Sequence, residues 1–174
     1  SLRPHILEGA YEVTEAIDLN DGHLLCEELG DMLLQIVFQA RLAEEAGLFA
    51  MQDVVQGITE KLIRRHPHIF GDVQATDAAA VLLNWEAIKR REKPERNSAI
   101  DGVPIGMAAL LAAEKLQKKA AQVGFDWRDI APVWAKCREE YEEFRAAAEG
   151  GEAAQMEEEF GDLLFSFVNL SRFL

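Results

Sequence analysis

A repeated segment constrains the fold of this chain more than any other feature. The segment Glu27–Ala43 recurs 131 residues later as Glu158–Leu174, with seven identities in 17 aligned positions. Both copies carry an E-x-x-D pattern among apolar residues that recur at helical spacing. The same register, without a gap, pairs Glu12 with Glu143. Each half is therefore predicted to contain a helical hairpin, with an acidic helix, a short turn and a second helix that carries E-x-x-D.

Helical periodicity extends over the remainder of the chain and predicts an all-α fold. Helices are expected over residues 6–18, 24–45, 53–65, 78–91, 107–123, 129–148 and 152–174. A lone hairpin buries one face poorly, so two hairpins, from one chain or from two protomers, are expected to form a four-helix bundle. The charged, Pro- and Gly-containing stretch 94–106 predicts a linker between domains at 1–93 and 107–174.

Composition narrows the classes of function. The chain has 31 acidic and 18 basic residues and a net charge of -13, which argues against a broad basic face for nucleic acid. Two cysteines are too few for a disulfide framework and predict a reducing, cytoplasmic setting. No apolar run approaches the ~18 residues of a membrane span. The last helical pattern has no stop signal before Leu174, so we expect a longer polypeptide.

Two pairs of acidic residues in the second half predict a metal site. Glu140 and Glu143 are three residues apart, as are Glu159 and Asp162, so each pair shares one flank of its helix. Both pairs lie on the same rotational side of an apolar stripe, and antiparallel packing is expected to bring the four carboxylates together. Such a cluster stays ionised when divalent cations neutralise it, with Mg²⁺ the first choice and Mn²⁺ an alternative.

A non-enzymatic interpretation stands beside this one. Acids spaced in this way are usually a solvated helix face, and the chain would then be a helical interaction module that binds a regulatory protein. A di-iron site would require Glu-x-x-His, and no histidine follows these acids at that spacing.

The chain resembles the MazG-type nucleoside triphosphate pyrophosphohydrolases, whose signature is E-x-x-E, a spacer and then E-x-x-D. Three flanking segments support the resemblance: Lys61–Phe70, Val123–Trp127 and Glu158–Leu164. The likeness covers essentially the whole chain and is to the two-domain bacterial form.

The resemblance implies an all-α homodimeric enzyme in which carboxylates hold Mg²⁺. Glu140, Glu143, Glu159 and Asp162 would hold the metal and carry catalysis. The metal would bind a nucleoside triphosphate and help activate a water that attacks the α–β linkage, releasing a nucleoside monophosphate and pyrophosphate. Clearing of unwanted nucleotides would be the role, with a narrow specificity for one deoxynucleotide or phosphoribosylated nucleotide as an alternative.

The first half departs from the signature at one position. Gly9 stands where the second half has Glu140, although four other acids remain as a weaker site: Glu8, Glu12, Glu28 and Asp31. We therefore expect the first domain to be structural or weakly active, and the second domain to be catalytic.

Several further residues are candidates for binding the substrate: Asn169, Lys115, Lys118, Arg172 and Trp127. The lysines and Arg172 would reach phosphates, and Trp127 would stack on a base. Two alternatives have equal weight: that Lys118 is a solvated surface lysine, and that Trp127 makes no contact with a base. Trp134 lies on the apolar stripe and is expected in the core.

Overall fold

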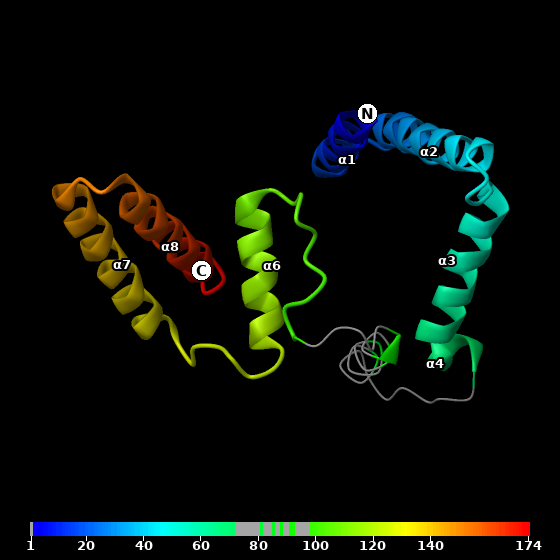
Figure 1. The fold of residues 1–174 in the computed structure, drawn as a ribbon. Coiled ribbons are helices and arrows are strands. Elements are labelled where there is room, and N and C mark those ends of the chain that lie inside the picture. The colour runs from blue at the N-terminus through cyan, green and yellow to red at the C-terminus, as the bar shows by residue number, and fades with distance from the viewer. Residues whose placement is uncertain (1, 72–80, 82–84, 86–87, 89–90, 93–97) are drawn as a thin grey trace. The chain divides into compact units, whose positions relative to one another are not determined.

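The computed structural model describes the chain except residues 1, 72–80, 82–84, 86–87, 89–90 and 93–97. The chain divides into two compact units, Ser1–Arg91 and Glu92–Leu174 (Figure 1). Within the described residues every regular element is a helix, which confirms the all-α prediction. The helix expected at 78–91 falls mostly outside the described residues. None of the described helices is long and apolar enough to cross a membrane.

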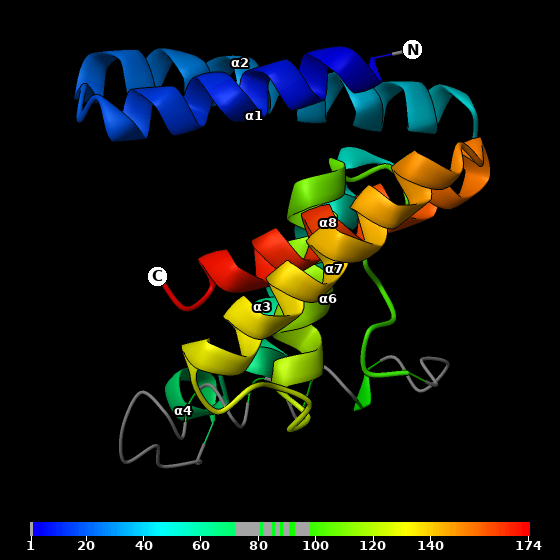
Figure 2. The ribbon, with the colours of Figure 1, turned by 90° about the vertical axis from the view of Figure 1, so that its left-hand side faces the viewer.

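The first unit is built on a hairpin of α1 (Arg3–Asp18) and α2 (Gly22–Glu45). The two helices run side by side along their length (Figure 2). Asp21 starts α2, because its Oδ1 accepts hydrogen bonds from the backbone N–H groups of His23 and Leu24 at 2.9 and 3.1 Å. Helix α3 (Met51–Arg65) packs on α2, and the short α4 (Pro67–Phe70) follows it.

The second unit contains α6 (Ala109–Ala121), α7 (Ile130–Gly150) and α8 (Ala153–Ser171). Asp129 is the N-cap of α7, where its Oδ1 accepts a hydrogen bond from the backbone N–H of Ala131 at 3.0 Å. Gly151 ends α7 with a φ of 76°, a conformation that favours glycine. Helix α8 packs against both α7 and α6, so side chains on α8 face two neighbours.

The core of the second unit is small. Val133, Cys137 and Leu170 form a buried cluster against which Ile130 and Phe173 pack. The expectation that Trp134 lies in this core is wrong: Trp134 is 47% exposed. Val133 and Cys137, four residues apart, face α8 directly, and Trp134 is turned about 100° away from Val133 around the helix.

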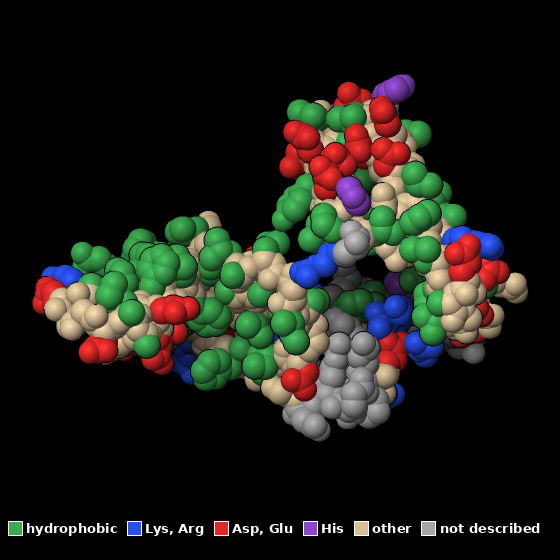
Figure 3. All heavy atoms as spheres, turned by 45° about the horizontal axis from the view of Figure 1, so that its top comes forward, with side chains coloured by type: hydrophobic (Ala, Val, Ile, Leu, Met, Phe, Trp, Pro, Cys, Tyr) green, Lys and Arg blue, Asp and Glu red, His purple; other side chains and the backbone are tan. Residues whose placement is uncertain are grey.

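Large apolar side chains remain exposed on both units. Hydrophobic side chains spread over the visible face of the α7–α8 hairpin, at the left of Figure 3. On α8, Phe160 and Phe167 are 47% and 45% exposed. In the first hairpin the fully buried apolar side chains are the small Ala16, Ala40 and Ala43, and many of the larger ones, such as Leu33 and Leu34, are exposed.

Replacing Val133 by Ala tests the importance of this small core. Val133 is 1% exposed, so we expect Val133→Ala to lower the free energy of unfolding by about 1.5–3 kcal/mol. Urea unfolding followed by circular dichroism measures the change. Val123→Ala, at a site 51% exposed, is the matched control and should change it by less than about 0.5 kcal/mol. Equal effects of the two substitutions would contradict the assigned core.

Candidate metal centre

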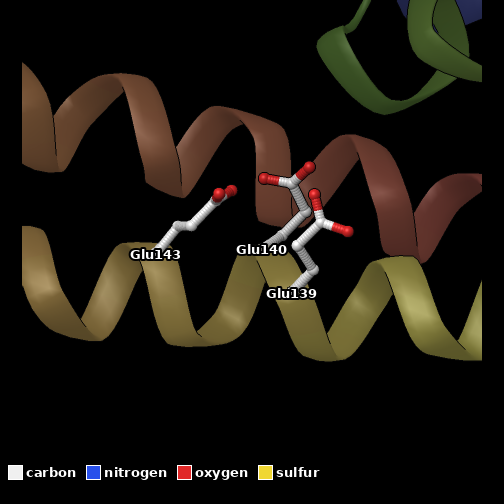
Figure 4. Close-up of side chains that lie close together, drawn as sticks. All are labelled: Glu139, Glu140 and Glu143. Carbon is white, nitrogen blue, oxygen red and sulfur yellow. The ribbon is translucent and has the colours of Figure 1, made fainter.

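Three glutamates on α7 bring their carboxylates together. One oxygen from each of Glu139, Glu140 and Glu143 lies within 4.8 Å of the others. The three side chains rise from α7 on the side that faces α8 (Figure 4). Glu140 is only 6% exposed, whereas Glu139 and Glu143 are exposed. One face of α7 therefore presents a buried carboxylate flanked by two solvated ones.

Glu140 also belongs to a second group that joins α7 to α8. Oxygens of Glu140, Glu159 and Asp162 lie within 4.8 Å of one another. The structure thus gathers the four acids singled out in the sequence around one buried member. Glu139 was missed, although its position directly before Glu140 was the available signal. Their action as metal ligands stays a prediction.

The negative charges of these acids repel one another. The pKa of Glu159 is raised, first because burial removes its carboxyl group from water, and then because Glu143, Asp162 and Glu140 lie nearby. A raised carboxyl pKa means that its negative form is disfavoured in this setting. Oxygen ligands under mutual repulsion suit a hard divalent cation, which removes the repulsion when it binds.

Lys136 gives the cluster a positive neighbour within the chain. Its Nζ lies 2.7 Å from Oε1 of Glu139 and 2.6 Å from Oε1 of Glu140. Hydrogen bonds to these two carboxylates raise the pKa of Lys136. Sequence analysis missed this residue, although its spacing of three and four residues from the two glutamates is the usual spacing of helical ion pairs.

A cavity of about 550 Å³ begins at these carboxylates. Glu140, Asp162 and Lys136 line one part of it, and Trp127, Phe125 and Leu116 contribute apolar surface. This volume lies in the usual range of about 300–1,000 Å³ for small-molecule sites. The cavity therefore combines part of an acidic cluster with apolar surface.

Three of the five predicted substrate-binding residues line this cavity: Trp127, Asn169 and Arg172. Lys115 and Lys118 are exposed on α6 and are absent from the cavity lining. Lys118 pairs instead with Glu114, with its Nζ 2.6 Å from Oε1 of that residue. Trp127 is 44% exposed, so its side chain is partly accessible. The roles of these five residues in binding remain predictions.

Arg172 is fixed by two neighbours. Its Nη2 lies 2.7 Å from Oδ2 of Asp126, and its Nη1 donates to Oδ1 of Asn169 at 2.8 Å. Because Oδ1 of Asn169 accepts this hydrogen bond, the Nδ2 group of the same amide is the end that can donate to another group. Arg172 therefore ties the loop before α7 to the end of α8 and orients Asn169.

A buried glutamine joins two helices beside the cavity, and sequence analysis missed it. Nε2 of Gln117, on α6, donates to the backbone oxygen of Phe165, on α8, at 2.7 Å. Its Oε1 has no hydrogen-bond partner within the part of the chain that the structure describes. Glutamine on an Ala-rich helix gives no signal of burial in the sequence alone.

The first unit repeats this pattern of acids with one carboxylate missing. Burial raises the pKa of Glu28, followed by the effects of Glu12 and Asp31, which are the counterparts of Glu143 and Asp162. Gly9, the counterpart of Glu140, is buried. Among the described residues, neither group of three possible metal ligands lies in the first unit.

The electrostatic coupling around Glu159 can be tested with one substitution. We expect Glu143→Gln to lower the pKa of Glu159 towards its ordinary value, because Glu143 is the first of the nearby charges that raise it. Titration of carboxyl carbon signals by NMR, in the absence of divalent cations, measures this pKa. As the pH falls, Glu159 should therefore bind its proton at a higher pH in the unmodified protein than in Glu143→Gln. A pKa that stays unchanged would show that Glu143 does not act on Glu159.

The chain is similar to known proteins along its whole length. The family model of the MazG nucleotide pyrophosphohydrolase domain matches residues 1–70. The chain is 47% identical over its whole length to the nucleoside triphosphate pyrophosphohydrolase/pyrophosphatase MazG of Thermotoga maritima, and covers 66% of that protein. It is 44% identical to the nucleoside triphosphate pyrophosphohydrolase of Escherichia coli K12, again over 100% of this chain, and covers 68% of that protein.

A third similarity extends to a longer protein. The chain is 47% identical over 99% of its length to protein YabN of Bacillus subtilis, and covers 36% of it. The chain spans about two thirds of the length of the Thermotoga and Escherichia relatives. Since the similarity to those two relatives runs through both units, the chain belongs to the MazG family of nucleoside triphosphate pyrophosphohydrolases.

Proposed function

We propose that this chain hydrolyses nucleoside triphosphates at the α–β linkage, releasing a nucleoside monophosphate and pyrophosphate. One observation carries the proposal: the cavity beside Trp127 and Asn169 is continuous with the carboxylates of Glu140 and Asp162. A nucleoside fits the apolar part, and its phosphates then lie towards the acids. The names of the Thermotoga and Escherichia relatives support the same reaction.

Mg²⁺ is the cation proposed for this site, with Mn²⁺ as a substitute. Glu140, Glu143, Glu159 and Asp162 would hold it, because carboxylate oxygens are the ligands that hard divalent cations prefer. When bound, the cation supplies neutralisation of phosphate charge and a lower pKa for water. Without it, the acidic cluster repels a triphosphate, so removal of divalent cations should abolish turnover.

The remaining cavity residues are proposed to bind and orient the nucleotide. Asn169, whose Oδ1 is held by Arg172, offers its Nδ2 as a donor to the substrate. Trp127 offers a partly open ring for stacking on a base. Holding the substrate in one pose is itself a large contribution to rate.

We propose a homodimer as the working form, with a cytoplasmic role in clearing unwanted nucleotides. The exposed apolar side chains Trp134, Phe160 and Phe167 support an interface between copies, because such surface is costly in water. A regulatory protein partner is the alternative occupant of this surface.

Two alanine substitutions test where catalysis occurs. We expect Glu143→Ala to lower the rate of pyrophosphate release from a nucleoside triphosphate by roughly 100-fold. Loss of a residue that only supports a metal ligand typically lowers activity by about 10- to 100-fold, and loss of a ligand should cost at least as much. Glu12→Ala, the matched change in the first unit, should leave most of the activity. A coupled assay for pyrophosphate measures both variants. Equal losses would contradict catalysis in the second unit, and release of orthophosphate alone would contradict cleavage at the α–β linkage.

Adding a carboxylate at Gly9 tests whether its absence weakens cation binding in the first unit. We expect Gly9→Glu to raise the number of Mn²⁺ ions bound per chain, measured by electron paramagnetic resonance titration. A Cβ at Gly9 would lie 3.8 Å from Cε of Met32 and 4.0 Å from Oε2 of Glu12, ordinary contact distances. Gly57→Glu, on α3 with nothing within 4 Å, is the control. An unchanged Mn²⁺ stoichiometry in Gly9→Glu would contradict the loss of a ligand as the cause.

A further inference from the structure

The cavity has two basic residues in its described lining, Lys136 and Arg172, and their partners differ. Arg172 binds Asp126 and Asn169, both outside the two groups of possible metal ligands. Lys136 instead binds two acids of the cluster. Of these two basic side chains, therefore, Lys136 is the one whose position depends on what the cluster holds.

The contact between Lys136 and Glu140 is short and involves a buried carboxylate. Nζ of Lys136 lies 2.6 Å from Oε1 of Glu140, whose side chain is 7% exposed. Lys136 itself is partly exposed at the rim of the cavity. Its charge is carried on a flexible four-carbon stem, so the ammonium group can change partners without any movement of α7.

Glu140 is common to both groups of acids, so a cation held by either group shares it. An ammonium group and a divalent cation on the same carboxylate repel each other. The ammonium group is therefore pushed away from Glu140 when the cation binds. A phosphate oxygen of a nucleotide in the adjoining cavity would then offer the ammonium group a strong acceptor in addition to Glu139.

We propose that Lys136 is an exchangeable counter-ion: it pairs with Glu140 when the cation is absent and binds a phosphate oxygen of the nucleotide when cation and substrate are bound. The inference rests on the proposed function, because the phosphate is that of the proposed substrate. Lys136 thus weakens binding of the cation in the absence of nucleotide, and strengthens binding of the nucleotide once the cation is bound. A simple ion pair that only stabilises α7 would not have these two opposite effects.

Lys136→Met tests the exchange, since it keeps most of the stem and removes the charge. Arg145→Met is the matched control on the same helix: Arg145 pairs with Glu142 at 2.8 Å and Glu149 at 3.8 Å, both outside the cluster. Calorimetry first measures the Kd of Mn²⁺ without nucleotide. It then measures the Kd of a non-hydrolysable nucleoside triphosphate analogue at saturating Mg²⁺.

We expect Lys136→Met to bind Mn²⁺ about two- to tenfold more tightly, and the analogue more weakly by a similar factor. Arg145→Met should change neither constant, and Lys136→Arg should restore both towards those of the unmodified chain. Circular dichroism confirms that each variant is folded. The opposite signs of the two changes are the signature of the exchange.

Unchanged or weaker Mn²⁺ binding by Lys136→Met would overturn the proposal. Tighter Mn²⁺ binding with unchanged binding of the analogue would overturn the phosphate half of it. The proposed function fails separately, if the unmodified chain binds Mn²⁺ and the analogue but releases no pyrophosphate. The two failures are therefore distinguishable.

Discussion

The burial of Glu140 between α7 and α8 is the constraint on which the second unit depends. A buried carboxylate is costly unless a partner neutralises it, and here the partner is Lys136 at 2.6 Å. The same carboxylate brings together acids from two helices, because both groups of possible ligands include it. Fold and chemistry thus meet at one side chain: the packing of α8 on α7 buries Glu140, and the charge of Glu140 makes the packed site suitable for a cation.

The first unit contains the same helical hairpin without a carboxylate at the position of Glu140. Gly9 is buried at the position that corresponds to Glu140. The surrounding acids keep the pattern seen around Glu159: the pKa of Glu28 is raised by burial and then by the nearby Glu12 and Asp31. The hairpin still forms, since its buried face is made of small apolar residues. The hairpin of the first unit therefore keeps its helix packing without a carboxylate at the position that corresponds to Glu140.

Much of the fold could be predicted from local signals. Asp129 and Gly151 mark the ends of α7 by cap chemistry that depends only on neighbouring backbone groups. The spacing of Glu159 and Asp162 placed both on one flank of α8. Sequence reasoning was wrong about Trp134, because periodicity finds an apolar stripe but not which part of it a neighbouring helix covers. It also missed Gln117, whose partner on α8 is 48 residues away in the chain.

The sequence by itself determined the helices, the repeat and the four acids of the second hairpin, since each follows from residues within a few turns of one another. Only the tertiary structure decided that Glu140 is the buried member and that Arg172 is held by Asp126. These outcomes depend on how α6, α7 and α8 pack and on where the loop containing Asp126 lies. The physical reason is that burial and ion pairing are set by distances in space, which helical spacing fixes within one helix and only packing fixes between helices.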